Sequence, residues 1–197
     1  GDEHTHGHPQ ERSVYDLLNQ AVEEVEPGAG GVLFAPWLHG NRSPFEDPLA
    51  RGLFLNIGIE TGKRQLLRAV LEGVAFHSRW MLETIERKVP RQERVRLVGG
   101  GAQSRVWAQI MADVTGRAVE VIEHPQHAGT LGGAVVCAVG LGLFKSFSEA
   151  KPLIRVRETF TPRPEHRAVY ERSYAVYKDL YRANRPLFRR LNAPTPL

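Results

Sequence analysis

The sequence predicts an α/β domain in which helices flank a mixed β-sheet, and three observations support this fold class. The first is segment 95–114, in which a short strand-like run ends on three glycines and apolar residues at helical spacing follow. The second is the alternation of strand-like and helix-like segments along the rest of the chain. The third is an ordinary globular composition, with 42% hydrophobic and 24% charged residues among 197, which can bury a substantial core.

The N-terminal part of the chain begins with a polar stretch and continues into a first helix. We expect residues 1–12 to be a flexible segment rather than a metal site, although three histidines alternate there: His4, His6 and His8. Ser13 can cap the helix that follows, and Asp16 three residues later can complete a capping box. A proline and several glycines at 27–31 end this helix.

Four short apolar segments are expected to be strands, and a long loop separates the first two. The strand candidates are 32–35, 53–57, 95–98 and 118–122. The loop, residues 36–52, sets charged side chains among prolines and glycines, and long loops of this kind are often functional. Arg42 or Arg51 could meet a phosphate there, but local ion pairs with Glu46 or Asp47 are the favoured interpretation.

Four more helices are expected after this loop. They are about 63–88 with Thr61 as its cap and Pro90 as its stop, the helix between the three glycines and Gly116, 130–143, and 165–191. The helix at 130–143 is rich in small residues, so we expect it to pack closely against a strand or another helix, with Cys137 as a buried small hydrophobe. Tyrosines at helical spacing in the last helix should form a packing face, and Pro186 should kink or split that helix.

Charge and hydropathy argue against several classes of protein. The longest apolar stretch, 134–144, is too short to cross a bilayer, and the N-terminus lacks the pattern of a secretory signal. The single cysteine fits a reducing compartment, so we expect a cytoplasmic protein without a membrane partner. The net charge of +4 comes mostly from the C-terminal third, which we interpret as a solvated helix face rather than a nucleic-acid surface.

Four segments, in order along the chain, resemble the motifs of the FGGY family of carbohydrate kinases. Segment 37–52 (WLHGNRSPFEDPLARG) resembles the family's GERSP…DP.ARG loop, and 68–76 (RAVLEGVAF) resembles its RA.LEG.AF helix. Segment 99–116 is similar to the family's GGGA.S..W.Q..ADV.G adenosine segment, and 128–134 is similar to its ALGAA helix start. The resemblance covers most of the chain between residues 32 and 144, and it is closest to the xylulokinase-like members of the family.

The resemblance implies both a fold and a reaction. The fold is the C-terminal lobe of a two-lobed, actin-like (ribonuclease H-like) ATPase, here residues 13–192 with 165–192 as a C-terminal helical extension. The reaction is transfer of the γ-phosphate of ATP, accompanied by Mg²⁺, to a sugar hydroxyl, here of a xylulose-like pentulose. The family's sugar site and catalytic aspartate precede the matched segments. Asp47 and Asp113 match neither, so no catalytic residue is assigned.

The resemblance also implies that five residues belong to a nucleotide site. Gly100, Gly101 and Ala102 would pass beside the adenosine, and Ser104 and Arg105 would lie near the adenine edge or the ribose. Arg105 stands where some relatives have an amide side chain, so we expect it to stack or to reach solvent. Glycine suits such a turn because it lacks Cβ, but on the glycines alone a tight β–α connection without a ligand is the slightly favoured interpretation.

Two functional hypotheses follow from these observations. In the first, the chain is the nucleotide-side lobe of a pentulose kinase, needs an N-terminal lobe to act on sugar and ATP, and is inactive alone. In the second, it is a degenerate lobe that acts as a binding or adaptor module. A homodimer is compatible with either hypothesis, and titration with nucleotide separates the two.

Overall fold

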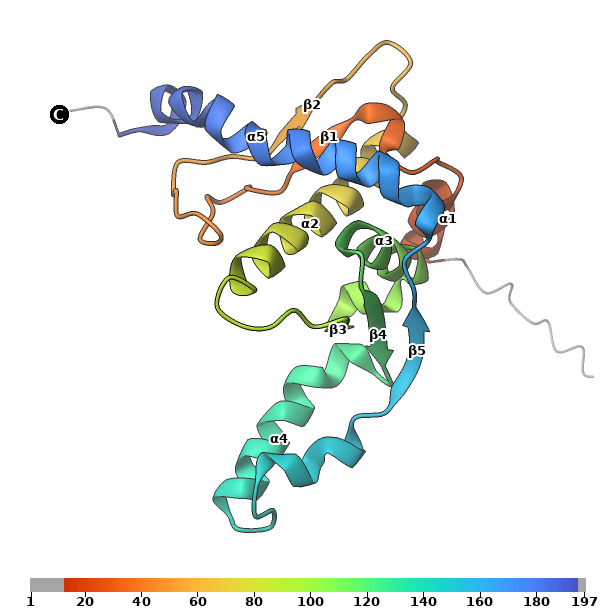
Figure 1. Ribbon diagram of the computed structural model, residues 1–197, viewed down its shortest axis with the longest axis vertical. Helices are drawn as coiled ribbons and strands as arrows, with labels where there is room; N and C mark the ends of the chain where they lie inside the picture. Colours follow the sequence, from red (N-terminus) through yellow and green to blue (C-terminus); the bar gives the residue numbers. More distant parts are fainter. Residues whose placement is uncertain (1–12, 195–197) are drawn as a thin grey trace, which may run out of the picture.

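The computed structural model describes residues 13–194 (Figure 1), so the segment 1–12 that was expected to be flexible lies outside the described residues. Helices and strands alternate over most of this range, as the sequence predicted. In chain order they are α1 Val14–Glu23, β1 Leu33–Ala35, β2 Leu53–Leu55, α2 Lys63–Ile85, β3 Arg94–Leu97, α3 Arg105–Thr115, β4 Ala118–Ile122, α4 Ala128–Gly140, β5 Val156–Phe160 and α5 Arg167–Asn192.

The strands form two separate sheets. Strands β1 and β2 pair antiparallel, whereas β4 lies between a parallel β3 and an antiparallel β5. The larger sheet is therefore mixed, as predicted, but its third strand, β5, was not among the four strand candidates. Helix α3 covers one face of this sheet, where Val119 and Val121 are buried with Ala108 and Ala112. On the other face Glu120 forms ion pairs with two arginines of β3, so this face is polar.

The main core lies between α2 and α5. The ring of Phe76 on α2 contacts the rings of Tyr170, Tyr174 and Tyr177 on α5, and all four side chains are buried. This confirms the packing face predicted from the tyrosine spacing. Helix α5 runs through Pro186 without interruption, so the predicted split is wrong; packing of the helix against α2 and β1 outweighs the one backbone hydrogen bond that proline removes.

A buried polar network fixes the end of α1 against this core. Arg68 donates to Glu72 at 2.7 Å, to the carbonyl oxygen of Val25 at 2.8 Å and to the Tyr170 hydroxyl at 3.0 Å. Glu72 also accepts from the Gly28 N–H at 3.0 Å. Burial raises the pKa of Tyr170, so its hydroxyl stays protonated. Because Arg68 and Glu72 belong to α2, the network sets the position of α1 relative to the rest of the domain.

The predicted caps and ends of the helices agree with the structure in part. The Ser13–Asp16 capping box at α1 and the left-handed Gly116 after α3 are both present, as expected. Helix α2 begins after Gly62 rather than Thr61, whose hydroxyl instead accepts from the Gly58 N–H in the preceding turn. Helix α2 ends at Ile85, ahead of the predicted end, and the chain turns before Pro90.

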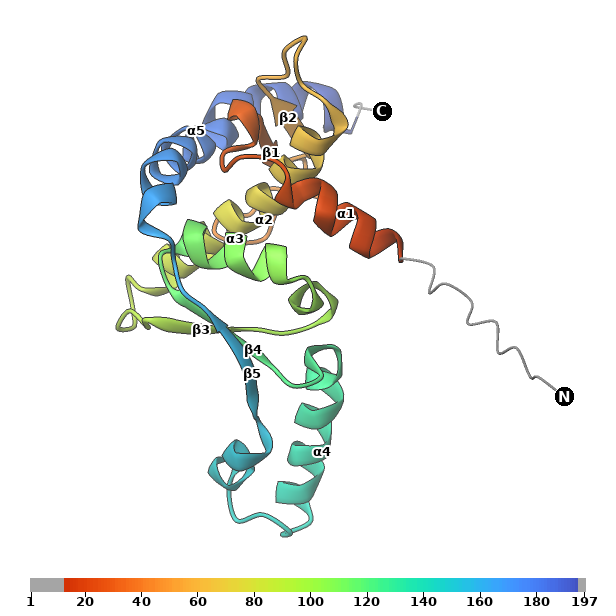
Figure 2. The ribbon, with the colours of Figure 1, turned by 90° about the vertical axis from the view of Figure 1, so that its right-hand side faces the viewer.

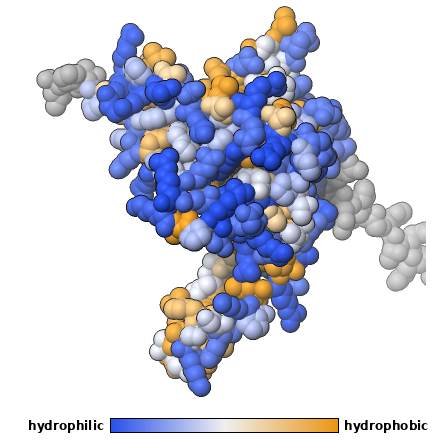
Figure 3. Space-filling view, viewed as in Figure 1, coloured by the Kyte–Doolittle hydropathy of each residue, from blue (hydrophilic) through white to orange (hydrophobic). Residues whose placement is uncertain are grey.

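Helix α4 contradicts the prediction of close packing. None of its residues is buried, and Cys137, expected to be a buried small hydrophobe, is exposed. Figures 1 and 2 show α4 and the 3-10 segment η4 (Phe147–Leu153) projecting from the end of the larger sheet, and apolar residues gather there in Figure 3. An added Cβ at Gly132 or Gly133 would meet no atom within 4 Å. The small residues leave room for a neighbour that residues 13–194 do not supply.

No helix in the described range has both the length and the apolar character needed to cross a membrane.

Candidate functional site

The glycine turn lies at one edge of the larger sheet. Because β3 and β4 run parallel, their carboxyl ends meet at this edge, which is where open α/β sheets bind ligands. The turn after β3 continues into the 3-10 segment η2 (Gly100–Gln103), and Gly99 adopts a positive φ of 87°. The Gly99 N–H donates to the Pro125 carbonyl oxygen at 2.8 Å. The glycine turn and the loop before α4 are therefore held side by side.

The three predicted residues of the turn have different surroundings. An added Cβ at Gly101 would lie 2.6 Å from the ring of Trp107, so glycine is needed there for packing within the protein. An added Cβ at Gly100 would meet no atom within 4 Å. Ala102 is buried against the sheet, and only 1% of the residue is exposed, so it is closed to a ligand. Gly100 is thus the position of the three at which a ligand can approach the backbone closely.

The other two predicted residues, Ser104 and Arg105, begin α3. The Ser104 hydroxyl accepts from the Trp107 N–H at 3.1 Å and donates to Asn19 of α1 at 2.6 Å. Its proton is thus already used within the protein. Arg105 forms an ion pair with Glu158 at 2.6 Å, and its guanidinium lies 5.8 Å from the ring centre of Phe160. Its side chain is 73% exposed, so it both contacts an aromatic ring and reaches solvent.

A cavity of about 780 Å³ adjoins the start of α3. This volume lies in the range of sites for small molecules and cofactors. Helix α1 and the segment after it supply acidic groups to its wall, and α3 and the chain before α5 supply polar and basic ones. The polar lining residues are Asp16, Asn19, Glu23, Glu26, Arg68, Gln103, Arg105, Gln109, Arg163 and His166.

The contribution of α1 to this cavity was not predicted. Asn19 and Ser104 are 85 positions apart, and no motif marks either as the partner of the other. The contact depends on the buried Arg68 network, which holds the end of α1 beside α3. The polar residues of α1 were the one signal in the sequence for this contribution, and they fit a solvated helix face equally well.

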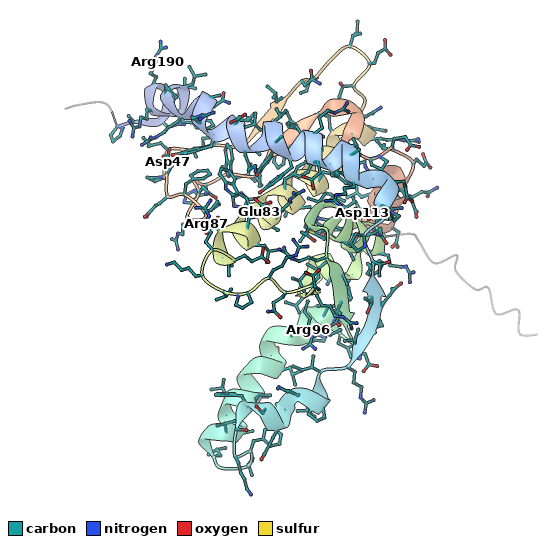
Figure 4. All side chains as sticks on the ribbon, viewed as in Figure 1. Asp47, Glu83, Arg87, Arg96, Asp113 and Arg190 are labelled. Atoms are coloured by element: carbon teal, nitrogen blue, oxygen red, sulfur yellow. The ribbon has the colours of Figure 1, made fainter. Side chains whose placement is uncertain are left out.

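Two buried aspartates are engaged in hydrogen bonds that hold the fold. Asp113 on α3 (labelled in Figure 4) accepts from Arg163 at 2.7 Å and lies 3.1 Å from the His166 ring nitrogen. Asp47 accepts from the Leu49 N–H at 2.8 Å and from the Tyr181 hydroxyl at 2.9 Å. Burial alone would raise the pKa of Asp47, but these hydrogen bonds hold it below its ordinary value.

In the loop 36–52, Arg51 does not form the ion pair that was expected with a nearby acidic residue. This side chain donates to the carbonyl oxygens of Pro48 and Ala50, at 2.8 and 2.7 Å, rather than to Glu46 or Asp47. The Asp47 carboxylate instead binds Tyr181 of α5. Between residues 13 and 194 no three or more His, Cys, Asp or Glu side chains are grouped so that they could hold a metal ion.

Comparison with known proteins agrees with this architecture. The family model described as the FGGY family of carbohydrate kinases, C-terminal domain, matches residues 4–141. A xylulose kinase of Staphylococcus epidermidis is 32% identical over 90% of this chain and 36% of its own length. The crystal structure of a xylulose kinase from Rhodospirillum rubrum superposes with a TM-score of 0.73 at 32% identity, over 89% of this chain and 35% of that one. A ligand-bound xylulose kinase from Lactobacillus acidophilus gives a TM-score of 0.81 at 22% identity, over 91% and 36%.

The mixed sheet with its flanking helices therefore has the fold of an actin-like ATPase lobe, as the sequence predicted. The chain belongs to the FGGY family of carbohydrate kinases, and it corresponds to the C-terminal domain of that family. It spans about a third of the length of the kinases that it matches.

Proposed function

We propose that this chain is the nucleotide-side lobe of a pentulose kinase, which transfers the γ-phosphate of ATP to a hydroxyl of a xylulose-like sugar. The observation that carries the proposal is the open Gly100 backbone at the carboxyl edge of parallel strands, in a turn whose last residue, Gln103, lines a cavity large enough for a nucleoside. The adenosine lies against the glycine turn, with Gly100 as the position at which it approaches the backbone. Its base enters the cavity at Arg105, which is the one of the five predicted residues that lines the cavity, and the guanidinium covers one side of the base.

Two helix N-termini support a polyphosphate at the same edge. Helix α3 starts directly after the glycine turn, and α4 starts after the loop that the turn contacts through Gly99. Neither helix has an acidic residue in its first turn, and α4 has no side-chain cap. Their N-terminal N–H groups therefore favour a phosphate. Mg²⁺ keeps most of its water ligands and binds phosphate oxygens, so it enters bound to the phosphates of ATP.

The described residues do not supply a base for the sugar hydroxyl. Phosphoryl transfer needs a carboxylate aligned with the attacking hydroxyl. Asp47 and Asp113 are buried and hold Tyr181 and Arg163. The catalytic aspartate and the sugar contacts belong to the remaining two-thirds of the kinases that this chain matches. We therefore expect residues 13–192 to act as one folded unit, in the cytoplasm, together with an N-terminal lobe.

Binding of ADP to the 197-residue chain tests the nucleotide site. Gly100→Val adds a side chain where the structure has open space, so it should weaken ADP binding at least tenfold while the melting temperature stays within about 2 °C. Gly140→Val is the matched control, because its Cβ also meets no atom and it lies at the far end of α4. Gly101→Val is unsuitable, since it would disrupt packing against Trp107.

The result is read by calorimetry with ADP up to 10 mM. Equal affinities for the parent and both variants would contradict the placement of the nucleotide at Gly100. A coupled assay for ADP release with D-xylulose and ATP tests the second part of the proposal. We expect no turnover by this chain alone, and robust turnover would show that it contains a complete active site.

A binding or adaptor module is the second candidate function, and the exposed apolar surface of α4 and η4 favours it. Val136, Leu141 and Phe147 are 58%, 78% and 61% exposed, and exposed apolar patches often mark interaction sites. The two candidates predict different results in the ADP titration. An adaptor without nucleotide would show no heat at 10 mM ADP and no change with Gly100→Val.

A further inference from the structure

A second cavity, of about 380 Å³, lies at the opposite end of α3 from the glycine turn. The end of α2, the end of α3, and the chain that leads into α5 form its wall, and Figure 4 labels two of its carboxylates, Glu83 and Asp113. We call it the arginine cavity after its five arginines. These are Arg79, Arg91, Arg117, Arg163 and Arg167, and the three acidic residues in the wall are Glu83, Asp113 and Glu171.

The carboxylates in the wall are already paired with two of the arginines. Arg79 contacts Glu171 at 2.9 Å and Glu83 at 3.1 Å, and it also donates to the Val114 carbonyl oxygen. Arg163 pairs with Asp113 at 2.7 Å. These contacts hold two guanidinium groups at the C-terminal end of α3, where free carbonyl oxygens favour cations. Glu86 and Glu93, which lie outside the wall, pair with Arg117 and Arg91, so Arg167 is the one arginine of the wall without a carboxylate partner among the described residues.

Arg117 contributes a buried and incompletely paired guanidinium. Its side chain is 1% exposed, and one terminal nitrogen pairs with Glu86. Its Nε and Nη1 atoms are buried without a hydrogen-bond partner among the described residues. Burial holds the pKa of this guanidinium below its ordinary value. A buried cationic donor without a partner is costly, and a nearby anion would offset that cost.

Arg167 and Arg91 add cationic groups with unused donors at the mouth of the cavity. Arg167 is exposed at the first position of α5, where the helix dipole disfavours a cation, and the first turn has no acidic residue. No carboxylate in the described range pairs with Arg167. Arg91 donates through Nε to Glu93 and through Nη2 to the Gly116 carbonyl oxygen, so its Nη1 is unused.

We propose that the arginine cavity binds the phosphate group of a small phosphorylated ligand. Guanidinium groups present planar pairs of N–H donors that match phosphate oxygens, and these charge-assisted hydrogen bonds are strong. The phosphate neutralises Arg167 at the start of α5 and offsets the buried charge of Arg117. The cavity is larger than inorganic phosphate needs, so it also admits a sugar attached to the phosphate.

The arginine cavity and the glycine turn lie at opposite ends of α3, an 11-residue helix about 16 Å long, although Arg163 lines both cavities. Phosphate binding here therefore does not depend on the kinase proposal, and the two can be tested by different variants of the same chain.

Thermal unfolding of the 197-residue chain in phosphate, against sodium chloride of equal ionic strength, tests the proposal. We expect phosphate at ten times its dissociation constant to raise the melting temperature by about 3–6 °C. Arg167→Ala should weaken phosphate binding about tenfold or more, because it removes charge-assisted hydrogen bonds. Arg172→Ala is the matched control, because Arg172 is exposed on the same helix and does not line the cavity.

Three outcomes would overturn the proposal. The first is a melting temperature in phosphate that is no higher than in chloride. The second is an equal loss of phosphate binding in Arg172→Ala and Arg167→Ala, and the third is a loss of phosphate binding in Gly100→Val. The last would place the phosphate at the glycine turn. Ribose 5-phosphate and ribose are compared by calorimetry as further probes. Tighter binding of the ester than of inorganic phosphate, again lost in Arg167→Ala, supports the site and identifies its ligand as a phosphorylated sugar.

Discussion

Helices α2 and α4 both contain glycine in their interior and both carry many apolar residues, yet one is packed on several sides and the other on almost none. Six residues of α2 are buried, including Gly73, where an added Cβ would overlap the Phe34 carbonyl oxygen of β1. No residue of α4 is buried, and Gly133 has open space beside it. A small residue thus shows that a close approach is allowed, but it does not show that a neighbour is present.

The surroundings of the two helices explain this difference. Helix α2 has polar and apolar faces, and its apolar face meets β1, α3 and α5 within the chain. Helix α4 is apolar all round, which is typical of a helix enclosed in a larger core. The kinases of this family that match the chain are about three times as long. We propose that their remaining residues provide the enclosure for α4.

Truncating one phenylalanine in each region should give the largest contrast. Phe76→Ala in α2 should lower the free energy of unfolding by about 3–5 kcal/mol, because it leaves a cavity among buried tyrosines. Phe147 in η4 is 61% exposed, so Phe147→Ala should change the free energy by no more than about 0.5 kcal/mol. Urea unfolding of the 197-residue chain measures both. A comparable loss in the two variants would mean that η4 is packed in solution.

The same glycine-to-alanine substitution should act with opposite sign in the two helices. Gly73→Ala should destabilise by about 1–3 kcal/mol or more, because β1 must move to admit the methyl group. Gly133→Ala should stabilise by up to about 1 kcal/mol, since alanine is the better helix former and its Cβ has open space. Chemical unfolding again supplies the values. Destabilisation by Gly133→Ala would show that α4 packs closely against a neighbour, as the sequence first suggested.

A smaller effect concerns pH and applies to the packed region alone. Burial holds the pKa of His77 on α2 below its ordinary value of 6.5, although a hydrogen bond with the Ser43 backbone opposes this. The Trp37 N–H donates to its Nδ1 atom, and the Tyr177 hydroxyl lies 3.4 Å from the same atom. The unfolded chain therefore binds a proton more readily. Stability should be full above pH 6.5 and should fall as the pH drops below that value.

Unfolding of the parent and of His77→Gln between pH 7.5 and 5 checks this expectation. Glutamine keeps an acceptor without a charge change in this range, so the variant should lose less stability than the parent as the pH falls. Parallel curves for the two proteins would exclude His77 as a source of the pH dependence.

The sequence was most informative where one segment sets its own conformation. The alternation of strand and helix patterns, the Ser13 cap and the left-handed Gly116 were all predicted from local residues. The glycine turn was placed correctly between β3 and α3 because three consecutive glycines interrupt two clear periodicities. Its role at a nucleotide was suggested by resemblance alone, and it stays a prediction.

Contacts between segments that are far apart in the sequence could not be predicted from local residues. Gly101 was predicted beside adenosine, but the nearness of the Trp107 ring gives it a packing role that its neighbours do not have. Neither cavity was predicted, since the first depends on Asn19 of α1 meeting α3, and the second on arginines from α2 and α5 meeting at the end of α3.

The sequence alone determined most of the elements, the fold class and the family, because helix and strand periodicity, caps and ordered motifs are all properties of local residue order. The tertiary structure alone decided which apolar helix is buried, which glycine is open to a ligand, and which arginines converge on one cavity. These outcomes depend on the atoms that lie opposite each side chain. The packed α2 and the exposed α4 differ for this reason, since burial belongs to a pair of surfaces and not to one segment.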